Sequence, residues 1–308
     1  GPGASADADE KHSPAQRVTR SIEAALARGV RPWARPWRDD AGCDALVLPR
    51  RANGQFYRGM NIVALWAAAA AAGYRSPYWF TFKQAQALGA HVRKGERGAF
   101  VVFYKDVKPA DQTTADADKR AAVRRILRGY VVFNHAQVEG LSDPRFDPPA
   151  PAAPSPADDL ALRFARVPAI VRFGGASAFY APGADYIQLP PKAAFIDATQ
   201  FYATLAHELG HWTRHPTRLA RDFGQKRFGD AGYALEELTA ELCAAFVGAV
   251  IGLPGEHIED HAAYIGDWLK ALQDNPAAFL TAAAKAQAAA DYLLRLMGEA
   301  PASEAPED

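Results

Sequence analysis

The sequence predicts an α+β protein of two domains joined by a linker, and three observations support this. The chain has 308 residues, 49% of them hydrophobic, enough to fill one large core or two of ordinary size. Residues 13–142 carry 21 lysines and arginines against 10 aspartates and glutamates, whereas residues 143–308 carry a net charge of −9. Residues 143–159 are rich in proline and alanine, a composition typical of an extended, exposed linker. We therefore expect domains at 13–142 and 160–297, and a disordered acidic tail at 298–308.

Cysteine usage and hydropathy indicate a cytoplasmic protein without membrane contact. Cys43 and Cys243 are the two cysteines of the chain, too few for a disulfide framework, so a reducing compartment fits. The longest apolar run, residues 242–253, is too short to span a bilayer. We also expect no leader peptide, because no basic-then-apolar stretch opens the sequence.

The basic half combines helical and strand patterns. Apolar spacing predicts a helix over residues 14–28, and strands are expected at 99–107 and 129–138. The polar stretch 109–120 between the strands is typical of a long loop. These elements need a core, to which we assign four aromatic residues, Phe80, Phe100, Phe103 and Phe133.

Aromatic and basic side chains alternate in the basic half in a way that favours nucleic-acid binding. Residues 30–37, with the sequence VRPWARPW, are followed by similar mixtures at 53–61, 76–85 and 91–98. Flat rings beside guanidinium groups suit unpaired bases on a phosphate chain, and each stacked base contributes roughly 1–3 kcal/mol. The alternative is that the arginines only solvate the surface. We expect single-stranded DNA as a partner, bound by Arg31, Trp33, Arg35, Trp37, Arg38, Tyr57, Arg58, Tyr78, Trp79, Lys83, Arg93 and Lys94.

The second half contains the motif HELGH in a segment, residues 199–214, whose apolar spacing predicts an amphipathic helix. His207 and His211 are four residues apart, so both imidazoles leave the same face of the helix within reach of one ion. Zinc held by two imidazoles and a third ligand keeps a position for water and lowers the pKa of that water towards roughly 7. Glu208 is placed to take the proton, which predicts a catalytic general base.

The third ligand is expected from the segment EELTAEL, within a second helical pattern that runs to Leu253. Glu237 and Glu241 are four residues apart and share a face, so one can bind the metal while the other accepts a ring N–H from a liganding histidine. We assign Glu237 as the ligand and Glu241 as the supporting carboxylate, and the reverse assignment stays open. Glu236 lies on a different face and is expected to be solvated, as is His215 at the helix end.

HELGH followed by Glu237, 26 residues after His211, resembles the gluzincin group of zincin metallopeptidases. The resemblance implies one zinc ion per chain on His207, His211 and Glu237, with Glu208 as general base and an acidic residue, Glu241, orienting the first histidine. The chain departs from the group in having glutamates at 236 and 241, where Asn and Asp are frequent. A metzincin is excluded because its third histidine is missing.

The segment before this helix, residues 169–190, alternates apolar and polar residues as a β-hairpin does. Zincin-like domains place an edge strand over the metal cleft, where an extended peptide adds by backbone pairing, and residues 185–190 are the expected equivalent. An ordinary strand of the sheet is the alternative. Tyr180, Tyr186 and Tyr233 are candidates for donating a hydroxyl hydrogen bond to a developing oxyanion.

Motifs along residues 13–297 together resemble the ArdC-type antirestriction proteins. They are, in order, PWARPW, YRGMNIVALW, SPYWFTFKQAQALGAHVRKGERG, VVFYK, YVVFNHAQVEGL and LAHELGHWTRHPTRLARDFG. That family joins a single-stranded-DNA-binding N-terminal domain, shared with TraC-type plasmid primases, to a zincin-like domain. The resemblance implies a mobile-element protein that shields incoming DNA from host restriction. Restriction or DNA-bound proteins are candidate substrates of its zinc metallopeptidase domain, and the sequence leaves the substrate open.

Two other functions stay open at this point. In one, the zincin-like domain is structural or binds a partner, and protection comes from coating single strands. In the other, the chain is a housekeeping metallopeptidase whose basic half binds RNA or an acidic protein. Glu208 favours catalysis, since metal binding alone has no need of it. The proline-rich linker predicts that the two halves are connected by little besides proximity.

Overall fold

The computed structural model describes residues 12–34, 46–107, 124–147, 155–224, 231–253 and 264–299. The elements of the first half are α2 (Pro14–Ala27), β1 (Arg50–Arg51), α3 (Met60–Ala72), β2 (Tyr78–Phe80), α4 (Phe82–Ala87), β3 (His91–Val92), β4 (Ala99–Val107), β5 (Arg124–Asn134), η1 (His135–Gln137), β6 (Val138–Glu139) and η2 (Pro144–Phe146). Those of the second half are α5 (Ala157–Phe164), β7 (Ile170–Phe173), β8 (Phe179–Ala181), β9 (Tyr186–Leu189), η3 (Lys192–Ala194), α6 (Ala198–Trp212), α7 (Ala231–Ile251), α8 (Ile265–Asp274) and α9 (Pro276–Met297). The protein is thus α+β, as predicted.

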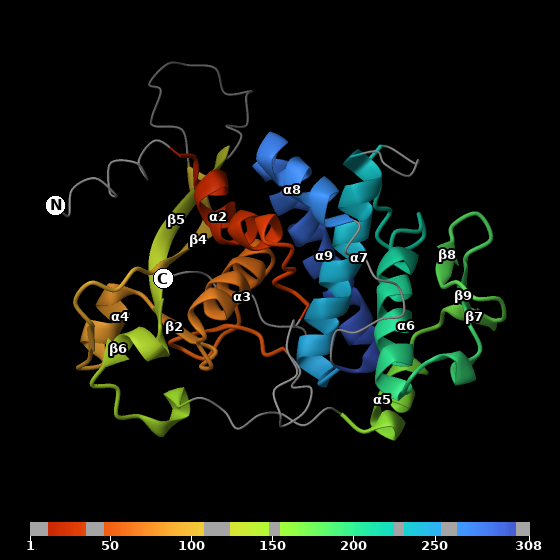
Figure 1. Cartoon of the computed structure of the whole chain (residues 1–308), viewed down its shortest axis with the longest axis horizontal. Helices are drawn as coiled ribbons and strands as arrows, with labels where there is room; N and C mark the ends of the chain where they lie inside the picture. The colour runs from red at the N-terminus through yellow and green to blue at the C-terminus, as the bar shows by residue number, and fades with distance from the viewer. Residues whose placement is uncertain are drawn as a thin grey trace, which may run out of the picture.

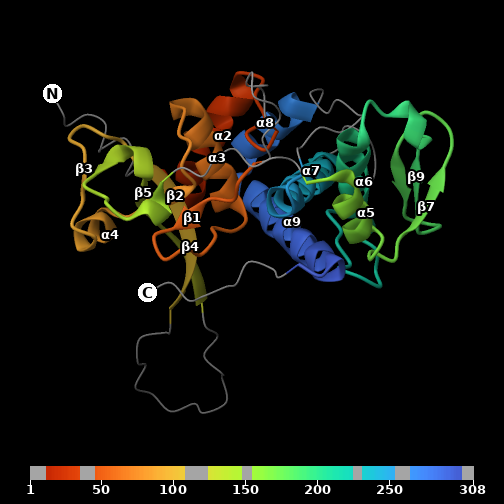
Figure 2. The ribbon, with the colours of Figure 1, turned by 90° about the horizontal axis from the view of Figure 1, so that it is seen from below.

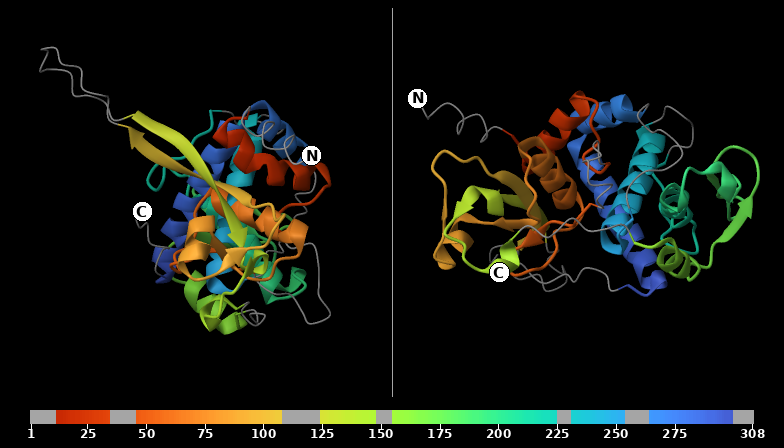
Figure 3. Two further views of the ribbon diagram at one scale, coloured as in Figure 1. Left: turned by 90° about the vertical axis from the view of Figure 1, so that its left-hand side faces the viewer. Right: turned by 60° about the horizontal axis from the view of Figure 1, so that its bottom comes forward.

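The N-terminal half is built on a sheet with the strand order β1-β2-β5-β4. Strands β4 and β5 pair antiparallel from Ala99 opposite Val132 to Val107 opposite Arg124, forming an arm that projects from the body of the protein (Figures 2 and 3). The predicted strand at 99–107 is confirmed as β4. Helices α2 and α3 pack against each other and against β4, which closes one face of this sheet.

The strand expected at 129–138 begins and ends earlier, as β5. Its first residues are the basic stretch RRILR, which has no apolar pattern of its own and is held as a strand by pairing with β4. The strand ends at Asn134, whose side chain accepts a hydrogen bond from the Ala136 N–H at 3.0 Å. The Gln137 side chain accepts one in return from the Asn134 N–H at 2.9 Å, so a capping box starts η1 at this point.

The C-terminal half is a layer of helices with a small sheet on its outer side (Figure 1). Helix α7 packs against both α6 and α9, and the sheet lies beyond α6. The helices predicted at 14–28 and 199–214 are confirmed as α2 and α6, and the pattern expected to run to Leu253 is α7. No helix in the described part of the chain is both long and apolar enough to cross a membrane.

Helices α6 and α7 pack tightly against each other at Gly210. A Cβ added at this glycine would lie 3.0 Å from Ala240 Cα and 3.2 Å from the Ala240 carbonyl oxygen. A side chain at position 210 would therefore force the two backbones apart by a few tenths of an ångström. The contact sets the separation of the two helices that carry the candidate site.

The outer sheet has the order β7-β9-β8, which corrects the predicted edge strand. Residues 185–190 contain β9, which pairs in parallel with β7 on one side and antiparallel with β8 on the other. The expected hairpin exists between β8 and β9, and its turn places Asp185 at φ 49°. Alternating polarity identified a strand but could not place it in the sheet, because the parallel pairing with β7 has no signal in the sequence.

The two halves share one hydrophobic core. Helix α3 has apolar residues on all its faces, and it packs against α2 and β4 as well as against α9. Trp66 of α3 contacts the ring of Phe246 on α7, with centroids 5.9 Å apart. Arg58, just before α3, forms an ion pair with Asp291 of α9. The prediction that little besides proximity connects the halves is therefore wrong.

The described ends of the predicted linker are folded rather than extended. Phe146 in η2 is fully buried and packs edge-on against Phe80 at 5.0 Å between centroids. At the other end, helix α5 already begins inside the predicted linker. Residues 148–154, the predicted loop at 109–120 and residues 300–308 of the predicted tail lie outside the described residues.

Candidate metal centre

The HELGH motif lies in the second half of α6, on the face turned towards α7. Asp197 starts this helix, since its side chain accepts a hydrogen bond from the Gln200 N–H at 2.8 Å. Helical spacing places His207 and His211 one turn apart on the same face. Their Nε2 atoms lie 3.1 Å apart, and Glu208 beside them is 4% exposed. The helix thus presents two imidazole nitrogens to one point.

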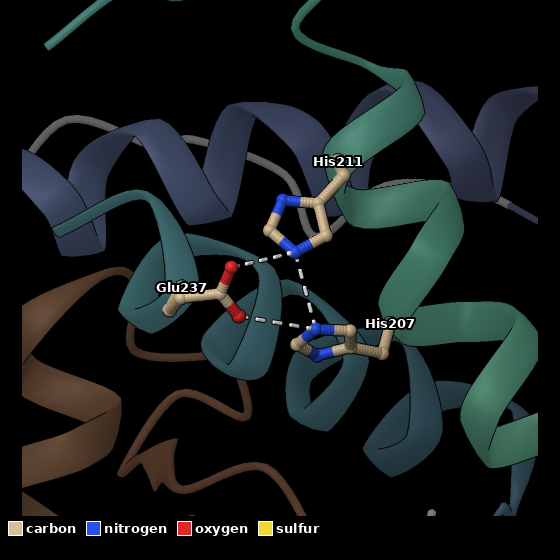
Figure 4. A group of neighbouring side chains, drawn as sticks. All are labelled: His207, His211 and Glu237. Atoms are coloured by element: carbon tan, nitrogen blue, oxygen red, sulfur yellow. Dashed lines mark hydrogen bonds and ion pairs between the residues drawn. The ribbon is translucent and has the colours of Figure 1, made fainter. Parts of the chain in front are cut away.

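Glu237 on α7 faces both histidines (Figure 4). Its Oε2 lies 3.5 Å from His207 Nε2, and its Oε1 lies 3.5 Å from His211 Nε2. Ligand atoms around a tetrahedral zinc ion are about 3.3 Å from one another. The donor atoms of these three side chains all lie within 4.8 Å of one another. Among the residues that the structure describes, they form the one such group of potential metal ligands. The structure therefore brings together the predicted ligand set at a spacing that suits a metal ion.

Glu236 is buried against His211, which corrects the prediction that it is solvated. It is 4% exposed, and its Oε1 lies 3.0 Å from His211 Nδ1. Both of its oxygens also accept hydrogen bonds from the Arg221 guanidinium, at 2.7 and 2.8 Å. Glu236 thus fixes the ring so that Nε2 points at the other two ligands, a role typical of carboxylates behind metal-binding histidines.

Arg221 was missed by sequence reasoning and joins several parts of the site. It is 4% exposed, and besides Glu236 it donates to the Gly210 carbonyl at 2.8 Å and to Thr213 Oγ1 at 2.9 Å. The guanidinium therefore ties the end of α6 to the start of α7. The residue lies in an irregular segment after α6, where no periodic pattern marks it as buried.

The site holds closely coupled charges. Burial alone would raise the pKa of Glu237, but the adjacent His211 and His207 rings hold it well below its usual range. Burial would lower the pKa of His211, yet Glu237 and Glu236 hold it well above its ordinary value. Burial would likewise raise the pKa of Glu236, which Arg221 and His211 keep at about 2. Such a cluster of carboxylates and imidazoles suits a cation, which replaces the histidine protons on binding.

Glu241 lies one turn after Glu237 on α7. Its Oε1 is 4.0 Å from His207 Nδ1, on the side where a supporting carboxylate was predicted. Its Oε2 accepts a hydrogen bond from the indole N–H of Trp33 at 3.0 Å. Glu237, and not Glu241, faces both Nε2 atoms, so the geometry favours the first of the two assignments left open by the sequence.

Several predicted DNA-binding residues are not available to a base. Trp33, Tyr57 and Trp79 are each 2% exposed, so their rings cannot stack on bases, and the prediction for them is wrong. Interleaved aromatic and basic residues suggested stacking, but the shared core between the halves takes up these rings. Phe80 is buried in the core as expected, and Phe100, Phe103 and Phe133 are half-buried.

The basic residues of the predicted set have different surroundings. Arg58 pairs with Asp291, Arg31 lies 3.5 Å from Glu241 Oε2, and Arg93 pairs with Glu96 at 2.6 Å. Tyr78 is half-buried, with its ring 5.1 Å from that of Phe146. Lys83 and Lys94 are exposed, so they remain accessible to a phosphate chain. The predicted residues Arg35, Trp37 and Arg38 lie outside the described part of the chain.

One of the three tyrosine candidates contacts a predicted metal ligand. Tyr233 lies one turn before Glu237, and burial, Glu237 and a hydrogen bond to Tyr264 raise the pKa of its hydroxyl. The Tyr180 hydroxyl donates to Asp185 at 2.8 Å, and burial followed by this bond raises its pKa to about 12. The Arg172 guanidinium lies over the Tyr186 ring, with its Cζ 4.1 Å from the ring centroid. Tyr233 is therefore the candidate that the structure places at the site.

Comparison with known families divides the chain in the same way as its two halves. The model of the N-terminal domain of the anti-restriction factor ArdC matches residues 12–133, and a model described as zincin-like metallopeptidase matches residues 159–285. Fold and site together define a zincin-like metallopeptidase module behind an ArdC-type N-terminal domain. The chain belongs to the ArdC family of antirestriction proteins.

Solved structures and relatives agree with this assignment. The metal-free crystal structure of the ArdC antirestriction protein from plasmid R388 matches with a TM-score of 0.75 and 40% identity, covering 92% of this chain and 97% of that one. Its Mn(II)-bound structure matches with a TM-score of 0.75, at 38% identity over 93% and 98% of the two chains. The uncharacterized protein y4eC of Sinorhizobium fredii is 44% identical over 283 residues, 90% of each chain. DNA primase TraC of Escherichia coli is 36% identical over 294 residues, which are 91% of this chain but 27% of TraC.

Proposed function

We propose that this chain is an antirestriction protein of a mobile element that binds single-stranded DNA and carries a zinc-dependent peptidase centre. Membership of the ArdC family supports the antirestriction role. The convergence of His207, His211 and Glu237 on one point is the observation that carries the peptidase proposal. Restriction enzymes and DNA-bound proteins are the proposed substrates, because a DNA-binding half would keep the site close to them.

The donor set fits a zinc ion. Two imidazole nitrogens and one carboxylate oxygen, with one position left for water, are the ligands of catalytic zinc in hydrolases. The related plasmid protein has been crystallised with Mn(II), so a divalent cation binds to at least one member of the family. We assign one zinc ion per chain to His207, His211 and Glu237.

The residues around the ligands provide the other parts of a hydrolytic site. A metal ion held by His207, His211 and Glu237 would supply Lewis-acid activation of water and of a peptide carbonyl. Glu208, next to His207 and 4% exposed, is the group that takes the proton of the attacking water and passes it to the leaving amine. Glu236 holds His211 in orientation, and Tyr233 brings a hydroxyl to the same side of α7 for hydrogen bonding to the tetrahedral oxyanion.

The proposed DNA surface differs from the one that the sequence predicted. Lys83 and Lys94 remain exposed, and the β4–β5 arm adds Tyr104, which is 63% exposed, with the exposed Lys105 and Arg128 close by. An exposed ring next to basic side chains is the combination that single strands require. The net positive charge of residues 13–142 adds affinity that weakens with salt.

A conjugation assay with the wild type and two variants, Glu208→Gln and His211→Ala, tests this proposal. We expect Glu208→Gln to retain zinc and DNA affinity but to lose cleavage and antirestriction, whereas His211→Ala should lose the metal as well. Full antirestriction by Glu208→Gln would show that coating of the single strand is sufficient and would refute the peptidase proposal. Stoichiometric zinc in His211→Ala, by elemental analysis, would place the metal elsewhere.

A further inference from the structure

The carboxylate of Glu241 is shared between the candidate metal centre and the N-terminal half. Its Oε1 lies 4.0 Å from His207 Nδ1. Its Oε2 accepts a hydrogen bond from the Trp33 indole N–H at 3.0 Å, and Arg31 Nη1 lies 3.5 Å from the same oxygen. Trp33 and Arg31 belong to the segment that follows α2, so one oxygen faces the C-terminal site and the other faces the N-terminal half.

The Trp33 bond is shielded from water and fixed by packing. Trp33 is 2% exposed and Glu241 is 4% exposed, so the bond joins a buried donor to a buried carboxylate, where a hydrogen bond is costly to lose. The Trp33 ring packs edge-on against Trp268, with centroids 5.4 Å apart. Trp268 is anchored in turn, since its own N–H donates to the Ala234 carbonyl on α7 at 2.9 Å. The indole N–H is therefore held in place independently of the carboxylate that it meets.

We propose that Trp33, assisted by Arg31, is a positioning residue of the metal centre. It fixes the Glu241 carboxylate, and Glu241 in turn acts on the His207 imidazole by charge attraction across the 4.0 Å between Oε1 and Nδ1. This inference rests on the proposed metal site. The sequence suggested that the segment after α2 binds DNA. In this proposal Trp33 instead supports the metal centre of the C-terminal half and does not stack on a nucleic-acid base.

The two imidazoles are thus supported from different parts of the chain. His211 is held by Glu236, on the neighbouring helix of the same half, whereas the Glu241 carboxylate behind His207 is held from the N-terminal half. Coupling between two sites is reciprocal. Metal binding should therefore stabilise the Trp33 contact, and any ligand of the N-terminal half that withdraws Trp33 should weaken metal binding.

The test is Trp33→Phe in the full-length protein, with zinc affinity measured by competition against a chromophoric chelator. Phenylalanine keeps an aromatic ring against Trp268 but removes the N–H donor. We expect about a tenfold loss of affinity, the lower end of the effect of removing residues behind metal ligands. Trp66→Phe is the matched control: Trp66 is also buried in the N-terminal half and donates its N–H to the Val47 carbonyl at 2.9 Å, away from the site. It should bind zinc as the wild type does.

A second comparison shows whether Trp33 acts through Glu241. In a protein that carries Glu241→Ala, adding Trp33→Phe should cost no further affinity, whereas an equal loss in both backgrounds would overturn the proposal. Wild-type affinity in Trp33→Phe, or the same loss in Trp66→Phe, would also overturn it. If Trp33→Phe does not fold, Arg31→Gln replaces it, with an expected loss of about twofold or more, and no loss would contradict the proposal. A wild-type protein that binds no zinc would instead refute the metal site itself.

Discussion

Replacing Gly210 with alanine tests how closely α6 and α7 must pack for the metal centre to form. The new Cβ would lie 3.0 Å from Ala240 Cα, 3.2 Å from Ala240 O and 3.3 Å from Ala240 Cβ. Two of these three atoms belong to the backbone, so α7 can relieve the contact only by moving as a helix. We expect the helices to separate by a few tenths of an ångström. This movement would carry His207 and His211 away from Glu237.

Two opposing effects set the size of the change in stability. Alanine is more favourable than glycine inside a helix by about 1 kcal/mol. Overpacking of a tight contact costs about 1–3 kcal/mol. The metal-free protein should therefore lose about 0–2 kcal/mol of unfolding free energy, or up to roughly 4 °C in Tm for a chain of this length. Zinc affinity should fall about tenfold, or about 1.4 kcal/mol, because the ligands no longer meet at the spacing that the metal requires.

Thermal unfolding of the metal-free proteins and chelator competition for zinc measure the two effects separately. Gly266→Ala is the control, since Gly266 also lies in a helix, α8, but a Cβ there has no neighbour within 4 Å. That variant should match or exceed the wild-type Tm and bind zinc normally. If Gly210→Ala gains stability as Gly266→Ala does and keeps its zinc affinity, the α6–α7 contact does not control the site.

Three further predictions concern the site, the DNA surface and the outer sheet. Glu236→Gln should lower zinc affinity about tenfold or more in chelator competition, because His211 loses its charged partner; unchanged affinity would contradict the role given to Glu236. Replacing Lys83 and Lys94 together with alanine should weaken single-stranded DNA binding and reduce its salt slope by about 1.4, as measured by fluorescence anisotropy across salt concentrations; a wild-type slope would exclude both residues from the interface. Asp185, whose pKa the Arg218 hydrogen bond lowers to about 2 against the effect of burial, should contribute stability above pH 4 that is lost as the pH falls towards 2. Asp185→Asn should therefore lower the Tm at neutral pH. The loss of unfolding free energy should be at most about 1 kcal/mol, because the Asp185 side chain is 36% exposed, and the difference from the wild type should vanish in acid. A difference that persists at pH 2 would exclude the ion pair as its cause.

The parts of the protein that the sequence predicts well are those with a regular period. Helix α6 and strand β4 follow from apolar spacing, and the i, i+4 spacing of His207 and His211 requires both rings to lie on one face. The same reasoning on α7 gives the pair Glu237 and Glu241, and the structure shows that Glu237 is the one facing both Nε2 atoms. Glu236 could not be placed in this way, because its burial depends on Arg221, which reaches it from an irregular segment after α6.

The burial of the aromatic residues could not be predicted from the sequence for a different reason. Composition alone does not separate a ring that stacks on a base from a ring that fills a core, and Trp33, Tyr57 and Trp79 have the same basic neighbours in either case. The distinguishing signal was α3, whose apolar residues on all faces require cover from more than the N-terminal sheet. That cover is the C-terminal half, where Trp33 packs against Trp268 and donates to Glu241.

The shared core bears on how this unit is inherited. The similarity to TraC spans 91% of this chain, so both halves occur together inside a protein that is several times longer. Separation by recombination would expose Trp66 of α3 and break the hydrogen bond from Gly59 N–H to Gln287 Oε1, now 2.9 Å long. Each fragment would then present a large apolar surface to water, a hazard for aggregation. We therefore expect the two halves to be inherited together rather than as separate fragments.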